Sequence, residues 1–495
     1  MIRFIHICFV LIKYGSLLLL LKTGIYKKPS GSFIRRFFEE AGGSFIKFGQ
    51  LLALRTDILP KEYSLAMIDL LDHVAPFPYH LVQERFLQEL GTKPEKLFLD
   101  FQKEPFASGS YGQVHAAKLE DGTIVAVKIM RPGIDEMVQA DFFIIGLVTT
   151  IAQTFFKISG FNWTEFAIEF KKWTLLELNY QAEAENAERL RRSIGPDRLI
   201  VIPKIYDRLS TKRILVQDYI DGFPLTRVLR GLKEGRITRE ELLEMGVDLT
   251  KTPRTLTYEI LHQLFFDGFF HADLHPGNII LMQNDQIGLI DFGIMGEWMS
   301  PNQTSFIRFA KNVGDHNFKK LTYYFCDVVS DDLKQMIQSA FPASMEQQHI
   351  DDFVHLLTNH LAQTVEEISV SSFKDIKEMK TDQTVLFMKL VGAGENYKLK
   401  LPQDMVIFLK AFSTLGLVAK EMNFAFSLTE EFKHFFKVHP EETIPVTPKT
   451  KPSLRMSRER AMEQLNNWLS YLMEARPDIY KLVQSSIMKY NTTDS

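Results

Sequence analysis

The chain has 495 residues, 45% hydrophobic and 24% charged, which is enough for two or three domains or for one two-lobed enzyme with extensions. Its formal net charge is −3. This balance lacks the basic excess typical of nucleic-acid-binding proteins, so we expect no nucleic-acid partner. The two cysteines, Cys8 and Cys326, lie too far apart along the chain for a short metal-ligand motif, which indicates reduced thiols.

The N-terminal segment is largely apolar at Phe4–Ile12 and Leu17–Leu21, but His6, Lys13 and Gly15 interrupt it. A membrane-spanning helix needs about 20 predominantly apolar residues, so this segment is borderline. It has no small-residue cleavage pattern of a signal peptide. We expect a helix on a membrane surface, with a true span and a buried core helix as alternatives. No other stretch is predicted to span a membrane.

The first half of the chain alternates between helical and strand-like patterns. Helical periodicity covers Phe33–Glu40 and Ser44–Leu54, with a break at Gly42–Gly43 and Ser44 as a candidate N-cap. Strand-like sequence begins at Lys103. The expected elements are a helix at Tyr79–Leu90 ended by Gly91, a hairpin of Gly109–Ala117 and Thr123–Met130 closed at Glu120-Asp121-Gly122, helices at Ala140–Phe156 and Glu165–Arg192, and strands at Leu199–Ile205 and Arg213–Tyr219.

Helices dominate the pattern from Thr238 onward. The expected exceptions are a short hairpin of Ile279–Met282 and Gln286–Ile290 around Asn284–Asp285, an exposed linker at Pro440–Pro452, and a terminal helix at Arg458–Ala475. A small β-rich segment is thus followed by a helical one, with the chemical motifs at the junction. This order predicts an α+β fold of two lobes around a cleft.

A loop of small residues, Ala107-Ser-Gly-Ser-Tyr-Gly-Gln-Val114, lies between two predicted strands. Small side chains let backbone N–H groups approach phosphate oxygens, although such a loop is more often a plain hairpin turn. The candidate nucleotide-binding residues in it are Ala107, Ser108, Gly109, Ser110, Gly112 and Val114.

Lys128, in Val125-Ala-Val-Lys128, follows on the next predicted strand. An ammonium among apolar neighbours needs an anionic partner. In kinases that partner is the α- and β-phosphate pair, and a glutamate from a helix holds the lysine. Glu183 is the candidate, with Glu185 and Glu188 as alternatives on a solvated helix face.

The strongest signal is His271-Ala-Asp273-Leu-His-Pro-Gly-Asn278 followed by Asp291-Phe-Gly293. The spacing of Asp273 and Asn278 is that of a kinase catalytic loop. Asn278 and Asp291 offer hard oxygen ligands to Mg²⁺, and Asp273 can orient a hydroxyl or water and accept its proton. The ordered set of motifs predicts a site for ATP and Mg²⁺.

His271 and His275 have an i, i+4 spacing that would suit zinc on a helix. Pro276 and Gly277 make a continuous helix unfavourable there, so we expect His271 to support the loop instead.

The stretch Phe45-Ile-Lys47-Phe-Gly49-Gln50, followed by Arg55-Thr-Asp57-Ile-Leu-Pro60, resembles the Lys-x-Gly-Gln signature of the UbiB/AarF atypical kinases, the family of the coenzyme Q-associated kinases of mitochondria. Glu177-Leu-Asn179 resembles the family's Glu-x-Asp motif, and His271–Asn278 is similar to its catalytic loop. Leu401-Pro402 with the helix after it also resembles the family.

The resemblance implies a bilobal protein-kinase-like fold, with a helical extension packed over the active-site cleft. It places Lys47, Gln50 and Glu177 at the nucleotide or substrate space. The domains expected on this basis are an apolar N-terminal helix at 1–30, the Lys-x-Gly-Gln extension at 31–102, a β-rich N-lobe at 103–225, a helical C-lobe at 226–438, and a linker with a final helix at 439–495.

Three features depart from the family pattern. Gly109 stands where the last alanine of an alanine-rich phosphate loop is expected, and Asn179 stands where the Glu-x-Asp motif ends in aspartate. The segment Arg458–Ser495 is polar, whereas some bacterial members end in spanning helices. After Asp-Phe-Gly no Ala-Pro-Glu follows, which argues against a broad Ser/Thr kinase.

The resemblance implies ATP hydrolysis or phosphoryl transfer that supports ubiquinone (prenyl-quinone) biosynthesis or lipid homeostasis. Its partners would be the nucleotide, quinone or prenyl-lipid precursors and biosynthetic enzymes, in the cytoplasm at the inner face of the cytoplasmic membrane or on the matrix side in mitochondria. The alternatives are a protein Ser/Thr kinase and a nucleotide-binding pseudokinase scaffold. Small-molecule phosphotransferases of the aminoglycoside type share the catalytic loop but lack the Lys-x-Gly-Gln helix.

Overall fold

The computed structural model describes residues 2–22, 31–53, 67, 75–155, 162–195, 198–298, 303–315, 317–329, 403–446 and 457–475, with a few single positions in the C-terminal third. The described chain divides into two compact units. One contains residues 1–230 and 276–294, and the other contains residues 231–275 and 295–495. The expected motif Arg55–Pro60 and the pair Leu401-Pro402 lie outside the described residues.

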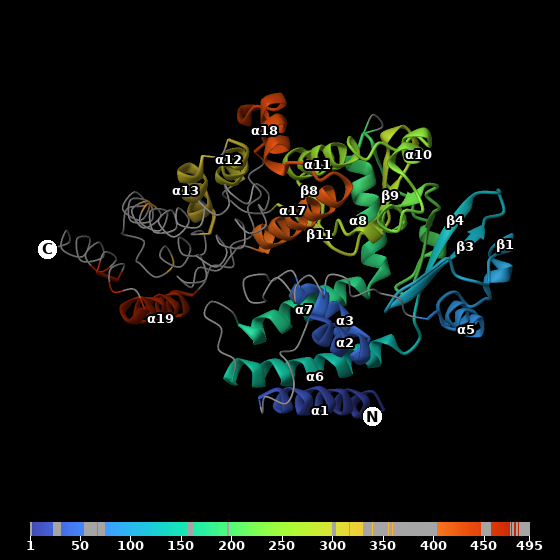
Figure 1. The fold of residues 1–495 in the computed structure, drawn as a ribbon, viewed down its shortest axis with the longest axis horizontal. Coiled ribbons are helices and arrows are strands. Elements are labelled where there is room, and N and C mark those ends of the chain that lie inside the picture. The colour runs from blue at the N-terminus through green and yellow to red at the C-terminus, as the bar shows by residue number, and fades with distance from the viewer. Residues whose placement is uncertain are drawn as a thin grey trace. The chain divides into compact units, whose positions relative to one another are not determined.

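The first unit is built on an antiparallel sheet with the order β1-β3-β4-β6, to which β2 adds beside β3 (Figure 1). Its strands are β1 Asp100–Phe101, β2 Ala107–Ser108, β3 Gly112–Lys118, β4 Ile124–Met130 and β6 Ile214–Asp218. The hairpin of β3 and β4 closes where the sequence predicts, because Gly122 adopts φ +91° and the Asp121 carboxylate accepts from the amide of Thr123 at 2.9 Å.

The alternation of buried residues along these strands places one sheet face on a hydrophobic core under α5 (Tyr79–Leu90), which ends at Gly91 in the left-handed conformation as expected. The fully or almost fully buried members of this core are Phe77, Val82, Phe86, Phe98, Phe101, Ala117, Val125, Val127, Ile129, Ile214 and Val216. The core therefore fixes β4, the strand that carries Lys128.

Helices from distant parts of the sequence also belong to the first unit (Figure 1). They are α1 Ile2–Lys22, α2 Gly31–Ala41, α3 Ser44–Ala53, α6 Ile134–Phe155, α7 Trp163–Glu177 and α8 Tyr180–Ser193. Arg3 of α1 bonds the buried carboxylate of Asp141 in α6 at 2.8 Å, and that carboxylate also accepts from the amide of Ser44 at 3.0 Å. Asp141 thus joins three helices.

Two expectations about these helices were wrong. Ser44 is the first residue of α3 rather than its N-cap. Its backbone amide donates a hydrogen bond to the carboxylate of Asp141. The single helix expected at Glu165–Arg192 is two helices, because Asn179 leaves the helical conformation and its side chain accepts from the amide of Ala182, capping α8.

The helix α6 begins before the expected Ala140, at Ile134. Over Ile134–Thr154 it is long and apolar enough to cross a membrane by length and composition, with a mean hydropathy of 1.3, and 33% of that stretch is buried. A core helix of a soluble protein can meet the same two criteria. This stretch was not expected, since only the N-terminal segment was considered apolar enough to span a membrane.

A second sheet in the first unit has the order β5-β10-β9-β7, and only β5 and β10 run parallel. Its strands are β5 Ile200–Val201, β7 Phe223–Pro224, β9 Ile279–Leu281 and β10 Ile287–Leu289. The β9–β10 hairpin turns at Asn284 and Asp285, both with φ near +60°, as its turn residues predict. The strand expected at Leu199–Ile205 is shorter, since regular pairing covers only β5.

The second unit is mainly helical, as expected, with a two-stranded pair that the sequence analysis missed. The pair is β8 Phe269–His271 and β11 Met295–Glu297. The helices are α10 Arg239–Glu244, α11 Thr252–His262, α12 Gln303–Gly314, α13 Phe318–Val329, α17 Gln403–Met422, α18 Leu428–Val438 and α19 Arg458–Ala475, while α9 Leu225–Lys233 crosses the boundary between the units.

Aromatic side chains fill the core of the second unit. Phe408 of α17 meets Phe306 of α12 edge-on, with ring centroids 4.6 Å apart, and Phe412 lies 5.3 Å from Phe432 of α18. Trp298, directly after β11, stacks on Phe306 at 3.7 Å. These contacts fix α17 against the strand pair that leads into the catalytic loop.

Candidate functional site

Lys128 lies at the centre of a charged cluster in the first unit. Its Nζ atom donates to the two carboxylate oxygens of Glu183 at 3.0 and 2.9 Å and to Oδ2 of Asp291 at 3.0 Å. The three residues come from β4, from α8 and from the loop after β10. The structure therefore brings together the lysine, glutamate and aspartate of three motifs that are far apart in the sequence.

Tyr180, which the sequence analysis missed, lies against the cluster. Tyr180 starts α8 and is 1% exposed, and Lys128 Nζ lies 4.8 Å from the centre of its ring. Tyr180 and Glu183 are three residues apart and share one face of the helix. The sequence feature that could have indicated Tyr180 is its position directly after Asn179, the residue that caps α8.

The electrostatics of the cluster follow from burial and from two carboxylates that share one lysine. Burial and the negative charge of Asp291 raise the pKa of Glu183 to about 7, against the opposing pull of Lys128. Burial disfavours the charged ammonium of Lys128, but Asp291 and Glu183 together raise its pKa well above the usual value. Lys128 is therefore a cation throughout the physiological pH range.

The small-residue loop joins β2 to β3. Ala107 pairs with Val114 and Ser108 with Gln113, and the amide of Gly109 bonds the carbonyl of Gly112 at 2.8 Å. A Cβ at Gly112 would lie 2.6 Å from the carbonyl oxygen of Ile129 and 2.6 Å from the hydroxyl of Tyr180. Only glycine fits this approach.

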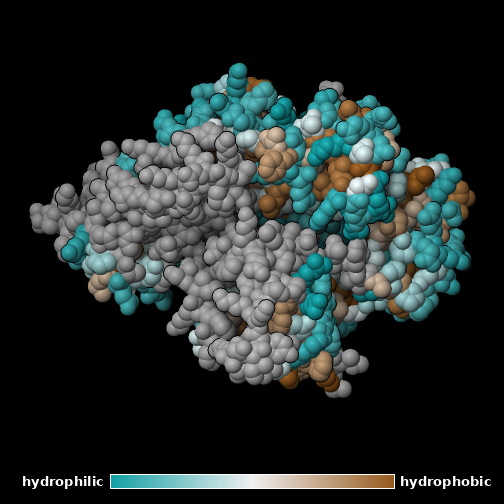
Figure 2. Space-filling view, viewed as in Figure 1, coloured by the Kyte–Doolittle hydropathy of each residue, from teal (hydrophilic) through white to brown (hydrophobic). Residues whose placement is uncertain are grey.

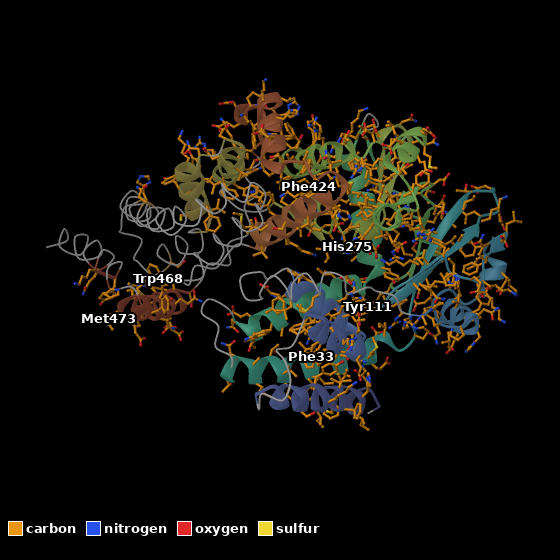
Figure 3. The ribbon with its side chains drawn as sticks, in the orientation of Figure 1. Phe33, Tyr111, His275, Phe424, Trp468 and Met473 are labelled. Atoms are coloured by element: carbon orange, nitrogen blue, oxygen red, sulfur yellow. The ribbon has the colours of Figure 1, made fainter. Side chains whose placement is uncertain are left out.

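The side chains of Ser110 and Tyr111 at the loop tip are buried. Figure 3 shows Tyr111 beside the end of the β3–β4 strand pair, near α2 and α3. Lys47 of α3 lies 4.9 Å from the centre of its ring and bonds the carboxylate of Glu177, the last residue of α7. The Lys-x-Gly-Gln extension therefore meets both the small-residue loop and the segment Glu177-Leu-Asn179.

Glu177 also approaches the Asp-Phe-Gly motif. An added Cβ at Gly293 would lie 3.7 Å from the Cα atom of Glu177 and 3.3 Å from Oδ1 of Asp291. The carbonyl oxygen of Phe292 accepts from the side chain of Asn186 in α8 at 2.9 Å. Asp-Phe-Gly is thus held by the same two helices, α7 and α8, that present Glu177 and Glu183.

The two expected metal ligands flank the open end of the β9–β10 hairpin. Asn278 precedes β9, Asp291 follows Ile290 after β10, and the amide of Ile290 bonds the carbonyl oxygen of Asn278 at 3.2 Å. Among the described residues no three His, Cys, Asp or Glu side chains gather as a metal site. One carboxylate and one amide oxygen nevertheless fit Mg²⁺, which takes few protein ligands when phosphates and water supply the others.

Asp273 belongs to the second unit. Its amide donates to Nδ1 of His271 at 3.2 Å, and the amide of His271 donates to the side chain of Gln263 at 3.0 Å. His271 is fully buried at the end of β8 and supports the loop through its bond to the amide of Asp273. His275 is exposed. Oδ1 of Asp273 lies 3.2 Å from Nζ of Lys410, a residue that the sequence analysis did not single out.

Glu185 and Glu188 lie apart from the cluster. Glu188 pairs with Arg191 at 3.0 Å, and Glu185 is exposed beside Gln181, so Glu183 alone of the three glutamates reaches Lys128. Gln50 lies on α3, and its side chain is outside the described part of the chain.

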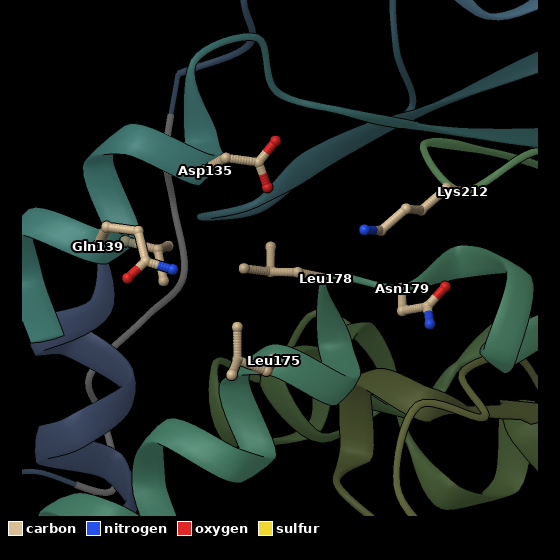
Figure 4. A pocket seen from close by; sticks show the side chains of 7 residues that line it. Asp135, Gln139, Leu175, Leu178, Asn179 and Lys212 are labelled. Atoms are coloured by element: carbon tan, nitrogen blue, oxygen red, sulfur yellow. The ribbon is translucent and has the colours of Figure 1, made fainter.

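A small pocket in the first unit opens beside the junction of α7 and α8 (Figure 4). It is lined by Asp135, Val138, Gln139, Leu175, Leu178, Asn179 and Lys212. None of the candidate nucleotide-binding residues lines it, so we do not assign the nucleotide to this pocket.

Comparison with known proteins identifies the family of the chain. Residues 69–325 match the model of the ABC1 atypical kinase-like domain. A protein of Clostridium pasteurianum, described only by its position upstream of hydrogenase 1, is 30% identical over 396 residues, which are 79% of this chain and 68% of that protein. The probable protein kinase UbiB of Pseudomonas aeruginosa is 34% identical over 281 residues, 55% of this chain and 50% of the kinase.

The chain thus spans about half the length of this UbiB kinase. A solved structure described as a complex of Rv3197 with erythromycin, from Mycobacterium tuberculosis, aligns with 87% of this chain and 99% of that one, at a TM-score of 0.47 and 22% identity. The matched domain and the α+β architecture agree with the expected kinase-like fold. The chain therefore belongs to the UbiB/ABC1 family of atypical kinase-like proteins.

Proposed function

We propose that this protein binds ATP with Mg²⁺ and turns it over, by hydrolysis or by transfer of the γ-phosphate to a small acceptor. The observation that carries the proposal is the convergence of Glu183 and Asp291 on Lys128. Protein kinases require an ion pair between this lysine and a helix glutamate, and they use the nearby Asp-Phe-Gly aspartate to bind Mg²⁺.

Each residue of the cluster then has a role. Lys128 binds phosphate oxygens while Glu183 keeps its ammonium in place, and the backbone of the loop from Ala107 to Val114 lies over the phosphates. Asn278 and Asp291 would hold Mg²⁺, which neutralises charge on the phosphates when it is bound. Asp273 orients the attacking hydroxyl or water and accepts its proton.

Two observations favour a small acceptor or water over a peptide. Lys47 of the extension is bonded to Glu177 beside the Asp-Phe-Gly motif, where it takes up space around the nucleotide site. No Ala-Pro-Glu platform follows Gly293 before α12 begins at Gln303. A protein Ser/Thr kinase and a pseudokinase scaffold remain the alternatives, and retention of Asp273, Asn278 and Asp291 disfavours the scaffold.

The pathway is proposed from the relatives. Proteins named UbiB kinase share 34% identity with this chain, and the family supports a role in ubiquinone biosynthesis. We place this chain in the same type of role, with quinone or prenyl-lipid precursors and biosynthetic enzymes as its partners.

We further propose contact with a membrane surface through α1 and α6, which pack side by side in the first unit. Exposed apolar side chains form one stripe on each helix: Phe4, Ile5, Phe9 and Ile12 on α1, and Phe143, Leu147 and Ile151 on α6. Hydrophobic atoms are visible along the lower edge of Figure 2, where α1 lies in Figure 1.

The sequence around the first stripe has a basic balance, which favours an anionic lipid surface. Residues 1–28 contain Arg3, Lys13, Lys22, Lys27 and Lys28 and no acidic residue, although Arg3 pairs with Asp141 and Lys13 with Glu40. In α6 no charged residue occurs between Phe142 and Phe155. Apolar stripes with a basic balance are typical of helices that lie in the interface of an anionic membrane.

The decisive experiment measures ADP release by the purified full chain with Mg²⁺-ATP, alone, with anionic vesicles, and with phenolic quinone precursors. We expect a basal rate that lipid or precursor increases. Labelling of the protein itself by γ-labelled ATP, without lipid stimulation, would support the protein-kinase alternative. Nucleotide binding without any turnover would leave the scaffold as the better account.

A further inference from the structure

The catalytic loop contains no residue with a permanent positive charge. From Asp273 to Asn278 the sequence is Asp-Leu-His-Pro-Gly-Asn, and His275 is its one titratable side chain besides Asp273. Phosphoryl transfer nevertheless accumulates negative charge beside the group that orients the nucleophile. Lys410 provides a cation next to Asp273 from outside the loop, with Nζ 3.2 Å from Oδ1.

The fold explains how a residue 137 positions away (410 − 273) reaches this loop. The helix α17 packs against β11, and β11 pairs with β8, the strand that leads directly into Asp273. Phe408 and Phe412, on either side of Lys410, are fully buried. The aromatic core therefore fixes the helix, and the helix fixes the lysine.

The charge of Lys410 lies in a largely buried environment, where it needs an anionic partner. Its side chain is 12% exposed, and its neighbours Leu409 and Ala411 are buried. Removing an ammonium from water costs free energy that only a good anionic partner offsets. At this position a methionine or leucine would fill the same space at lower cost, and the structure has a lysine paired with the expected base.

We propose that Lys410 is a positioning residue for Asp273: it fixes the carboxylate in one orientation and keeps it ionised, so that Asp273 can align the attacking hydroxyl or water. The inference rests on the proposed nucleotide turnover. In a loose phosphoryl-transfer transition state the alignment of the nucleophile matters more than the strength of the base. A cation beside Asp273 therefore aids turnover even though it lowers the basicity of the carboxylate.

The test compares Lys410→Met, Lys410→Arg and the matched control Lys420→Met in the full chain. Lys420 lies on the same helix, ten residues on and roughly 15 Å along its axis. We expect Lys410→Met to lower kcat for ADP release by about 10- to 100-fold. Its Kd for Mg²⁺-ATP should stay within about twofold of the wild-type value, because Lys128 and the phosphate loop are untouched. Lys410→Arg should recover most of the rate, and Lys420→Met should behave as the wild type.

The pH profile gives a readout that a purely structural ion pair would not change. Loss of the neighbouring cation should raise the pKa of the base, so the acid limb of kcat should move up by about one pH unit in Lys410→Met. Besides Asp273 and Lys410, the titratable side chains on β8, this loop, β11 and α17 are His271, His275, Glu297, Asp404, Lys420 and Glu421. Their charges are the same in both proteins, so they do not produce the shift.

A double-mutant cycle covers the case in which Lys410→Met folds poorly because Asp273 is left without its cation. Asp273→Asn with Lys410→Met removes both charges. If Lys410 acts through Asp273, this double variant should turn over ATP within about twofold of Asp273→Asn alone. Additive losses, or a wild-type kcat and pH profile in Lys410→Met, would overturn the assignment. If the wild-type chain releases no ADP, both the proposed turnover and the proposed role of Lys410 are wrong. If the wild type turns over ATP and Lys410→Met does so equally well, only the role of Lys410 is wrong.

Discussion

Glu177, the last residue of α7, is bonded to Lys47 of the N-terminal extension. The pair connects the extension to the helix that precedes α8, and α8 presents Glu183 to Lys128. Both side chains are about one-quarter exposed, so water screens the pair in part.

We expect Lys47→Met and Glu177→Gln each to lower the free energy of unfolding by about 1 kcal/mol. The double variant should lose no more than the larger single loss, because each change removes the same ion pair. Urea unfolding of the four proteins measures the coupling. Lys13→Met serves as the control, since Lys13 pairs with Glu40 at the surface and its loss should have a smaller effect. Additive losses for Lys47 and Glu177 would show that the two residues act independently.

Asp291→Asn should abolish binding or turnover of Mg²⁺-ATP while the protein stays folded. The change removes a carboxylate that would bind the metal ion and is one of the two anionic partners of Lys128. Titration with a fluorescent ATP analogue, with and without Mg²⁺, measures binding, and a thermal melt checks the fold. Normal ATPase activity in this variant would refute the metal assignment.

Asp273→Asn should bind Mg²⁺-ATP but turn it over about 10²–10⁴-fold more slowly, the scale of a lost positioned base. The amide keeps the shape of the side chain and its place beside Lys410, but it cannot accept the proton. Single-turnover ADP formation measures the chemical step apart from product release. A rate equal to that of the wild type would favour the scaffold.

The sequence predicts the parts of this site that depend on short patterns. Only local residues decide the turns at Gly122 and at Asn284–Asp285, and both turns are present in the structure. Each chemical motif is likewise recognised from a few neighbouring residues. The break between α7 and α8 was missed even though Asn179 is a residue type that favours N-caps, because the charged helical pattern continues across it.

Long-range partners give no such local signal. Lys410 reaches Asp273 only because α17 packs on β11, and nothing near position 410 in the sequence indicates that contact. The strands β8 and β11 have three residues each, too few to show the alternation that identifies a strand. Packing of helices on a short strand pair decides these positions, so they follow from the fold and not from the motifs.

The raised pKa of Glu183 predicts a pH dependence of stability. A carboxyl group whose pKa is about 7 in the folded chain and near 4.5 when unfolded binds a proton more tightly in the folded state. Its contribution to stability is therefore complete below about pH 4.5 and is lost as the pH rises through 7. Glu183→Gln cannot titrate, so the wild type should lose stability relative to this variant between pH 5 and pH 8.

Thermal melts of the nucleotide-free proteins at pH 5 and pH 8 measure that difference. Glu188→Gln is the control, because its hydrogen bond to Arg191 lowers the pKa of Glu188. Stability due to Glu188 is present above its unfolded pKa and is lost only in more acidic solution, so its difference from the wild type should be constant from pH 5 to pH 8. A constant difference for Glu183→Gln as well would contradict the raised pKa.

The membrane proposal predicts that both helices contribute to vesicle binding. Replacing Phe9 and Ile12 by Glu removes two exposed apolar side chains from α1, and replacing Phe143 and Leu147 by Glu does the same on α6. Each lost side chain forfeits about 1.5–3 kcal/mol of burial in the interface, so either pair of changes should weaken binding by well over tenfold. Co-sedimentation with vesicles that contain anionic lipid measures the bound fraction.

Phe424→Glu is the matched control, because Phe424 is 84% exposed but lies in the second unit, between α17 and α18. It should bind vesicles as the wild type does. Loss of binding in the α1 variant alone would restrict the membrane contact to the N-terminal helix. The exposed apolar side chains of α6 would then not contact lipid. If both double variants bind normally, the apolar stripes do not face lipid. A change in oligomeric state in the same variants would then identify the stripes as the interface between two copies of the chain, which gel filtration would detect.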